Sequence, residues 1–325
     1  MENSRDFGNT IAVLVGPTAT GKSRLALEIA KLLPIEIVNG DSRLLYRHMN
    51  IGTAKPSASE MDNTPHHLIN ILDPNEPYSL ALYINDARRS IEQIHKAGRL
   101  PLLVGGTGQY IWGLIDGFQT PQVAPSPEIR DKLEAEAGIY GKEYVWQKLN
   151  AVDTDSASHI DFRNLRRVIR ALEVYLETGV PFSKAKKKDQ SPPYRSLIIG
   201  LKMENSVLYE KIEKRSDMMM ELGWIEEVSC LLKNGYGIDS PAMSSIGYRE
   251  IASHLSGFIS REDVIKLVKT ATRKFARRQY SWFRQNDTRI NWIDANRDIK
   301  DVVIDAYSLI QKSIGINYTH TAYAE

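Results

Sequence analysis

Short apolar runs alternate with segments of helical periodicity over the first third of this 325-residue chain. Continuous apolar runs at residues 11–15, 35–38 and 100–104 have the length of buried strands. Between them, residues 23–33 and 83–97 carry apolar side chains at helical spacing. Because buried strands that alternate with helices form parallel sheets, we predict an α/β fold, a parallel sheet wound by helices.

The pattern changes after residue 117. Three prolines interrupt residues 121–127, a helix-rich segment covers residues 128–178, and residues 184–193 are first basic and then proline-rich. A strand-like run at 196–201 then returns the chain to the sheet. We therefore predict an α/β core made of residues 1–117 and 194–325, interrupted by an all-helical insertion domain of residues 118–193.

The rest of the core after this returning strand is expected to be helical. It ends in a short apolar segment and a polar tail, residues 320–325, that we expect to be loose.

The first strand runs directly into G-P-T-A-T-G-K-S, which fits the phosphate-binding P-loop pattern with a strand before it and a helix after it. Backbone N–H groups and the helix N-terminus favour a phosphate there. Lys22 is expected to reach a diphosphate, and the Ser23 hydroxyl is expected to bind a divalent cation. The predicted diphosphate-binding residues of this loop are Gly16, Pro17, Thr18, Ala19, Thr20, Gly21, Lys22 and Ser23.

The ends of the other two strands argue against an ordinary P-loop NTPase. The strand at 100–104 runs into Gly105-Gly106-Thr107, where such enzymes usually place a magnesium-binding acid. The acid at a strand end is instead Asp41. Since ligands bind at the carboxyl ends of parallel strands, the P-loop, Asp41 and Thr107 should surround one crevice. This pattern suits a site that binds a diphosphate and uses one carboxylate as a base toward a second substrate.

Composition is that of an ordinary globular protein, with 42% hydrophobic and 25% charged residues. The single cysteine, Cys230, excludes an internal disulfide, and no histidine or cysteine spacing indicates zinc. No apolar run approaches the roughly 20 residues that span a bilayer. Residues 1–10 lack the apolar stretch of a signal peptide, so we expect a cytoplasmic protein.

The formal net charge is only +2, but basic residues gather in two segments. Residues 161–189 contain eight basic and four acidic residues, and residues 261–289 contain nine basic and three acidic residues. This excess of basic residues indicates a polyanion-binding surface. In the second segment, one helical stripe is predicted to hold Lys266, Lys269, Arg273, Arg277 and Arg284. A different side of that helix carries apolar residues that we expect in the core: Leu267, Ala271, Phe275 and Trp282.

Several further segments together resemble the tRNA dimethylallyltransferase family. They are D-S-R-L-L-Y at 41–46, I-G-T-A-K-P at 51–56, G-G-T-G-Q-Y at 105–110, R-A-L-E-V at 170–174, residues 208–228, I-G-Y-R-E at 246–250 and A-R-R-Q-Y-S-W-F-R at 276–284. The motifs follow the family order over almost the whole chain. Departures are small: Gly40 replaces a common alanine, and Gln109 replaces a common apolar residue. The lack of a zinc-finger motif makes the resemblance one to the bacterial form.

This resemblance implies transfer of a dimethylallyl group from dimethylallyl diphosphate to N6 of the adenosine just 3′ of the anticodon, with release of diphosphate. Asp41 then accepts a proton from N6, and Thr107 hydrogen-bonds the bridging oxygen. Lys22, Ser23 with Mg²⁺, and Arg215 are expected to neutralise the departing diphosphate.

The same resemblance implies a tRNA anticodon stem-loop as partner, with the target base extruded into the pocket. Residues that align with tRNA contacts of the family are Asp41, Ser42, Arg43, Leu44, Thr107, Arg130, Arg166, Arg167, Val168, Ile169 and Arg170. From the basic stripe, we expect Lys269, Arg273 and Arg277 to hold backbone phosphates. Neither a membrane nor an obligatory protein partner is expected.

Three alternatives share parts of this pattern. An adenylate isopentenyltransferase would use the P-loop and Asp41 on a smaller substrate, but it lacks the long basic insertion and I-G-T-A-K-P. A small-molecule or nucleotide kinase and a non-catalytic RNA-binding NTPase are also compatible with a P-loop. Neither His66 and His67 nor the methionines at 218–220 are expected to take part in catalysis.

Overall fold

The computed structural model describes residues 7–315 apart from residues 120, 122, 124, 186 and 189–191. The chain forms two compact units, a core unit of Met1–Ile115 with Pro193–Glu325 and an insertion unit of Asp116–Pro192. The sequence predicted unit boundaries after residues 117 and 193, whereas the structure has them after residues 115 and 192. In the part of the chain that is described, no helix is long and apolar enough to cross a membrane.

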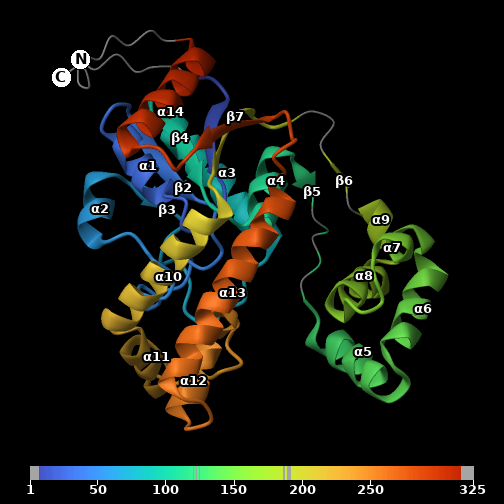
Figure 1. The fold of residues 1–325 in the computed structure, drawn as a ribbon. Coiled ribbons are helices and arrows are strands. Elements are labelled where there is room, and N and C mark those ends of the chain that lie inside the picture. Colours follow the sequence, from blue (N-terminus) through green and yellow to red (C-terminus); the bar gives the residue numbers. More distant parts are fainter. Residues whose placement is uncertain are drawn as a thin grey trace. The chain divides into compact units, whose positions relative to one another are not determined.

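A six-stranded sheet with every pair parallel forms the centre of the core unit (Figure 1). Its strand order is β3-β2-β4-β1-β7-β8. The strands are β1 (Thr10–Val15), β2 (Ile35–Asn39), β3 (His66–His67), β4 (Leu100–Val104), β7 (Arg195–Lys202) and β8 (Ile290–Asp294). All six residues of β1 are buried, which requires helices on both faces of the sheet.

Helices cover the two faces because the crossovers run in opposite directions. Helix α1 (Lys22–Ala30) leads from β1 to β2, whereas α3 (Leu80–Lys96) leads back from β3 to β4. Right-handed connections therefore put these two helices on opposite faces. The C-terminal helix α14 (Ile299–Ile314) packs beside α1 over one face, while α4 (Gly108–Ile115) contacts α3. Both faces of the sheet thus bury an apolar layer.

A second apolar cluster lies under the helices that follow β7. These are α10 (Asn205–Glu221), α11 (Trp224–Lys233), the 3₁₀ helix η1 (Pro241–Ser244), α12 (Tyr248–Leu255) and α13 (Arg261–Trp282). Trp224 and Tyr248 fill the cluster together with Met219 and Met220. Two of the three methionines at 218–220 are therefore packing residues, whereas Met218 is half-exposed. The short helix α2 (Ala58–Asn63) lies between β2 and β3 in the chain.

The strands expected at 11–15, 35–38, 100–104 and 196–201 are confirmed as β1, β2, β4 and β7. Two further strands, β3 and β8, were not expected. The β8 strand lies at the sheet edge, where Ile290 and Ile293 are buried but Asn291 is exposed. An edge strand that buries only part of its length has no continuous apolar run for a sequence pattern to detect. The polar tail at 320–325 lies outside the described residues.

The insertion unit is built from helices around its own apolar cluster. The helices are α5 (Pro127–Tyr140), α6 (Lys142–Val152), α7 (Thr154–His159), α8 (Leu165–Thr178) and α9 (Phe182–Ala185). The expected all-helical content is wrong in one detail, because β5 (Phe118–Gln119) pairs antiparallel with β6 (Lys187–Lys188). These two short strands join the beginning of the unit to its end.

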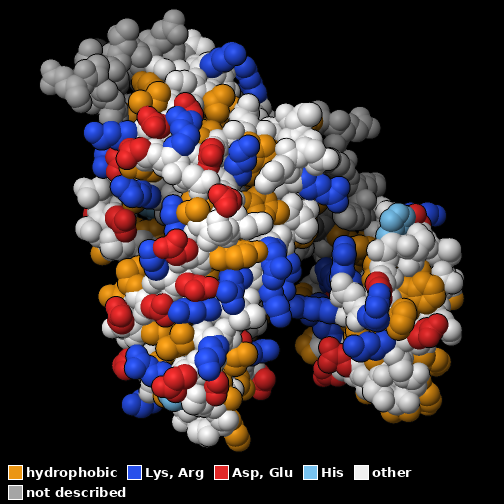
Figure 2. Space-filling view, in the orientation of Figure 1, with side chains coloured by type: hydrophobic (Ala, Val, Ile, Leu, Met, Phe, Trp, Pro, Cys, Tyr) orange, Lys and Arg blue, Asp and Glu red, His pale blue; other side chains and the backbone are white. Residues whose placement is uncertain are grey.

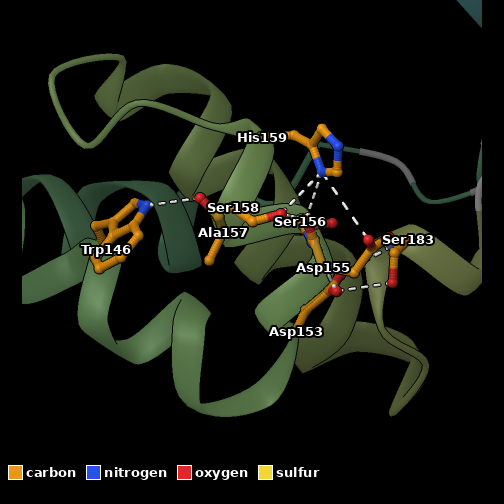
Figure 3. A network of polar contacts seen from close by, with 8 residues as sticks. All are labelled: Trp146, Asp153, Asp155, Ser156, Ala157, Ser158, His159 and Ser183. Carbon is orange, nitrogen blue, oxygen red and sulfur yellow. Dashed lines mark hydrogen bonds and ion pairs between the residues drawn. The ribbon is translucent and has the colours of Figure 1, made fainter.

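Buried Asp153 ties the last helix of the insertion unit to the others (Figure 3). Its carboxylate caps α7 by accepting the Ser156 N–H at 3.0 Å. It also accepts the N–H and the hydroxyl of Ser183 at 2.9 and 2.7 Å. Burial would raise the pKa of Asp153, but these hydrogen bonds outweigh burial and lower it. The nearby His159 contacts the Ser158 hydroxyl and the Asp155 carbonyl oxygen through the same atom, Nδ1. These are local contacts at the end of α7 and do not form a catalytic triad.

A second buried carboxylate, Glu173 of α8, joins α8 to α5. Its side chain is 0% exposed and accepts bonds from Arg130 Nε at 2.7 Å and Arg130 Nη2 at 3.0 Å. It also pairs with Arg170 and accepts the Ser126 N–H at 2.8 Å. Burial would raise the pKa of Glu173, but the hydrogen bonds from both arginines and Ser126 outweigh burial and lower it. Two guanidinium groups therefore neutralise one buried charge.

We expect Glu173→Gln to lower the free energy of unfolding of the insertion unit by about 3 kcal/mol at pH 7, because it leaves two arginines without their carboxylate. The native pKa is below the unfolded value, so this stabilisation is present above about pH 4.3 and is lost as pH falls through the native pKa. Hydrogen exchange in α5 and α8 measures the change. Glu177→Gln, exposed on the same helix, is the control, and equal exchange in both variants would contradict the assignment.

Candidate active site

Three loops meet at the carboxyl ends of β1, β2 and β4, and backbone hydrogen bonds join them. The Gly40 N–H donates to the Val104 carbonyl at 2.7 Å, and the Thr107 N–H donates to the Gly40 carbonyl at 3.2 Å. The Gly105 N–H donates to the Leu14 carbonyl at 3.2 Å. A Cβ at Gly105 would lie 2.1 Å from the Gly40 oxygen, so only glycine allows this contact. The three loops that were expected to meet at the strand ends are thus joined by the backbone itself.

The P-loop between β1 and α1 depends on glycine at both ends. Gly16 has φ +140°, and a Cβ there would lie 2.5 Å from the Leu201 carbonyl oxygen on β7. Gly21 has φ +91° at the N-cap of α1, and Ala19 also has a positive φ, +66°. This backbone turns sharply within a few residues, as the curled loop that cradles a phosphate requires.

Lys22 lies at the first position of α1 and folds back over the P-loop. Its Nζ donates to the carbonyls of Gly16 at 2.9 Å and Pro17 at 2.7 Å. The buried Thr20 hydroxyl donates to the same Pro17 carbonyl at 2.9 Å. Ser23, next along the helix, is exposed. The loop therefore presents one ammonium and one hydroxyl at a helix N-terminus, which is favourable for an anion.

A second cation reaches the P-loop from α10. Arg215 Nη2 donates to the Thr18 hydroxyl at 2.8 Å. Burial lowers the pKa of Lys22 to about 8, where the charge of Asp41 opposes the shift and that of Arg215 adds to it. Burial also lowers the pKa of Arg215, again opposed by Asp41. One carboxylate and two cations therefore interact in partly buried surroundings, where electrostatic forces are stronger than in water.

Asp41 is held in place by Asn39, the last residue of β2. The Asp41 N–H donates to Asn39 Oδ1 at 2.8 Å, while Asn39 Nδ2 donates to the carbonyls of Asp41 at 2.9 Å and Leu68 at 2.8 Å. Asn39 is 2% exposed. The Arg43 N–H occupies Asp41 Oδ1 at 2.8 Å, and no described residue donates to Oδ2. No role of Asn39 was predicted from the sequence, although a polar residue at the end of a buried strand could have indicated a site residue.

Thr107 lies directly opposite the segment that begins with Asp41. Its Oγ1 accepts the Ser42 N–H at 3.1 Å and lies 3.4 Å from the Ser42 hydroxyl. Arg43 Nη1 donates to the Ser244 hydroxyl at 3.1 Å, and the Leu44 carbonyl accepts a backbone N–H. The structure thus brings Asp41, Ser42 and Thr107 together with the P-loop, as expected.

Among the described residues, no group of three or more histidine, cysteine, aspartate or glutamate side chains could hold a metal ion. The Ser23 hydroxyl is the oxygen donor that the P-loop offers at the start of α1. A single hydroxyl fits Mg²⁺, which is usually bound by few protein ligands together with substrate phosphates and water.

The I-G-T-A-K-P segment is anchored from α11. Glu227 accepts the backbone N–H groups of Asn50, Ile51 and Gly52 at 2.7, 2.8 and 3.2 Å, and the Tyr248 hydroxyl at 2.7 Å. This carboxylate therefore fixes the loop that follows the Asp41 segment. Glu227 lies in a segment that resembles the family, at residues 208–228, but no role was predicted for it from the sequence.

Two other features complete this anchor. The Trp224 ring lies where a Cβ at Gly52 or at Gly247 would be, 2.1 and 2.3 Å from its nearest atoms. Lys55 Nζ donates to the Tyr46 carbonyl and to Asn70 Oδ1, both at 2.6 Å, and burial lowers the pKa of Lys55 to about 8. The I-G-T-A-K-P motif is therefore held by side chains and backbone groups of the core unit.

The predicted tRNA contacts of the insertion unit differ in availability. Arg166 and Arg167 are exposed on α8. Arg170 and Arg130 are engaged with Glu173. The side chains of Val168 and Ile169 are 0% and 3% exposed within the apolar cluster, so they do not reach the surface.

The basic stripe of α13 is partly paired with acids of the neighbouring α10. Lys269 lies 2.7 Å from Asp217, and Arg273 lies 2.7 Å from Glu213. Figure 2 accordingly shows basic and acidic side chains side by side over these helices. Arg277 is exposed.

The apolar side of α13 was assigned wrongly. Leu267 and Trp282 are 47% and 48% exposed, and neither is in the core. The buried residues of α13 are Val264, Val268, Thr272, Ala276 and Gln279. Thr272 and Gln279 received no place in the expected core, because the apolar periodicity alone does not reveal a polar side chain that has buried partners.

The site thus combines a P-loop, a carboxylate at a strand end and a threonine in place of the magnesium-binding acid, which suits an enzyme that binds a diphosphate and uses one base toward a second substrate. The model of the family "IPP transferase" matches residues 44–286. The chain belongs to this family, and the resemblance drawn from the motifs is confirmed.

Relatives of similar length support this assignment. The chain is 44% identical to the tRNA dimethylallyltransferase of Carboxydothermus hydrogenoformans over 89% of this chain and 93% of the relative. It is also 44% identical to that of Roseiflexus castenholzii over 93% and 98%.

Two solved structures are similar as well. The tRNA isopentenylpyrophosphate transferase of Bacillus halodurans has 38% identity and a TM-score of 0.71, covering 95% of this chain and 97% of that one. A eukaryotic dimethylallyltransferase acting on tRNA has 25% identity and a TM-score of 0.82, covering 97% and 82%.

We expect Glu227→Gln to lower the free energy of unfolding by about 2–3 kcal/mol, because a charged acceptor of three N–H groups and a hydroxyl is lost. Chemical unfolding followed by tryptophan fluorescence measures the change. Glu226→Gln alters the exposed neighbour and should have little effect. Equal unfolding midpoints for the two variants would contradict an anchoring role of Glu227.

Proposed function

We propose that this protein transfers the dimethylallyl group of dimethylallyl diphosphate to N6 of the adenosine 3′-adjacent to the anticodon in tRNA. Relatives at 44% identity carry the name of this activity. The observation that carries the proposal is the arrangement of Asp41, which interacts electrostatically with Lys22 and Arg215, across from Thr107. Asp41 thus supplies a single carboxylate beside the P-loop, and the loop that follows β4, Gly105-Gly106-Thr107, contains no acid.

In this reaction N6 attacks C1 of the dimethylallyl group, the C–O bond to diphosphate breaks, and one proton leaves N6. Asp41 accepts that proton. Its Oδ1 is occupied by the Arg43 N–H, which leaves Oδ2 to face the substrate. An exocyclic amine is a weak nucleophile, so a positioned carboxylate within hydrogen-bond distance speeds its attack.

The departing diphosphate gains negative charge as the C–O bond breaks. Lys22 and Arg215 reach the P-loop from two elements and stabilise that charge, and the Thr107 hydroxyl donates to the bridging oxygen. Ser23 would hold Mg²⁺, which supplies further neutralisation of the phosphate oxygens when bound.

The basic side chains provide contacts for the anticodon stem-loop. In the insertion unit these are the exposed Arg166 and Arg167, and in the core unit the exposed Arg277. Lys269 and Arg273 exchange an acidic partner on α10 for a phosphate if they bind tRNA. The absence of an obligatory protein partner and a cytoplasmic location stay predictions.

We expect Asp41→Asn to slow prenyl transfer about 10²–10⁴-fold while tRNA affinity is retained, because the amide cannot accept the N6 proton. Nucleoside mass analysis of unmodified tRNA, incubated with Mg²⁺ and dimethylallyl diphosphate, measures one prenyl unit on the adenosine beside the anticodon. Asp62→Asn, an exposed aspartate of α2, is the control and should keep the wild-type rate.

The same assay separates the alternatives. A prenyl gain on free AMP but not on tRNA would favour an adenylate isopentenyltransferase. Nucleotide hydrolysis or phosphate transfer without any prenyl gain would favour a P-loop NTPase or kinase.

For tRNA binding, we expect Arg277→Ala to weaken affinity and to reduce the slope of log affinity against log salt by about one, the effect of one lost phosphate contact. The double variant Lys269→Ala with Arg273→Ala should reduce the slope further. Lys300→Ala, which removes an exposed lysine of α14, is the control. If affinity and slope stay unchanged in the α13 variants, the stripe does not hold phosphates.

A further inference from the structure

Gln279, in the last turn of α13, joins the P-loop, which follows β1, to the loop that follows β4. Its Oε1 accepts the Thr18 N–H of the P-loop at 2.7 Å. Its Nε2 donates to the carbonyl of Gly106, in the loop after β4, at 3.0 Å. The side chain is 3% exposed, so water does not compete for either hydrogen bond. One amide thus spans the distance between the diphosphate loop and the loop that carries Thr107.

The space for this amide is reserved by the backbone. A Cβ at Gly106 would lie 2.1 Å from Gln279 Nε2, so any other residue at position 106 would displace the amide. The end of α13 is also fixed, because Trp112 Nε1 donates to the Trp282 carbonyl at 2.9 Å and Phe283 is fully buried. Gln279 therefore projects from a rigid support.

An uncharged amide meets both demands of this position at neutral pH. The Thr18 N–H requires an acceptor, and the Gly106 carbonyl requires a donor. An ionised carboxylate offers acceptors alone, and an apolar side chain of the same length offers neither. Arg215, which binds the Thr18 hydroxyl, interacts electrostatically with Lys22 and Asp41.

We propose that Gln279 is a positioning residue for prenyl transfer, which sets the distance between the P-loop and Thr107. The inference rests on the proposed function. The P-loop holds the diphosphate, whereas the Thr107 hydroxyl must meet its bridging oxygen. A shift of about 1 Å between groups that hold the two ends of a reaction can reduce the rate about 100-fold. Gln279 acts on the chemistry only through the position of Thr107 relative to the P-loop.

The test is a double-mutant cycle between Gln279→Met and Thr107→Val, measured as single-turnover rates of prenyl transfer to tRNA. Methionine keeps the volume and removes both hydrogen bonds. We expect Gln279→Met to lower the rate about 10- to 100-fold in the wild-type background. In the Thr107→Val background we expect no more than about a twofold further loss, because the positioned hydroxyl is already absent. Gln93→Met, exposed on α3, is the control.

A wild-type rate for Gln279→Met would overturn the proposal. So would a loss that repeats in full in the Thr107→Val background, since general destabilisation multiplies and does not depend on the hydroxyl. If Gln279→Met does not fold, judged by its thermal unfolding midpoint, Gln279→Glu of nearly equal shape takes its place in the same cycle. A wild-type protein without any prenyl transfer would instead contradict the proposed function.

Discussion

The loops that carry Asp41 and Thr107 lie together because the backbones of Gly40 and Gly105 touch. These glycines follow β2 and β4, which are neighbours in the sheet, and a Cβ at position 105 would overlap the Gly40 carbonyl. Hydrogen bonds from Gly40 to Val104 and from Thr107 back to Gly40 fix the register of the two loops. The chemistry of the site therefore begins with a contact between two residues that have no side chains.

The charges of the crevice follow from the same constraint. Burial lowers the pKa values of Lys22 and Arg215, and Asp41 opposes both shifts. Without a bound polyanion, the carboxylate is the counter-charge that makes two half-buried cations tolerable. In the proposed reaction, a bound diphosphate would take over that role and Asp41 would accept the proton from N6.

Much of the core could be predicted from sequence, because its signals are local. Each of β1, β2 and β4 is a continuous apolar run, and the P-loop pattern lies between a strand and a helix, so Asp41 and Thr107 could be placed from strand ends alone. The edge strand β8 escaped prediction because only part of it is buried. The exposed Leu267 and Trp282 were misplaced because the buried face of α13 includes Thr272 and Gln279.

The supporting residues could not be found in this way, because their partners are distant in the chain. Glu227 lies 175 or more residues from the N–H groups that it accepts, and Gln279 lies 261 residues from Thr18. Glu173 likewise engages Arg130, which the family pattern assigned to tRNA. A motif identifies such residues without telling which of them touch substrate and which hold the fold.

The most direct test is a crystal structure of the protein with an anticodon stem-loop and an unreactive thio analogue of dimethylallyl diphosphate. We expect the adenosine N6 at about 2.6–3.2 Å from the Asp41 carboxylate, the diphosphate on the P-loop, and the bridging sulfur beside Thr107. A base held away from Asp41, or a diphosphate bound outside the P-loop, would contradict the proposed reaction.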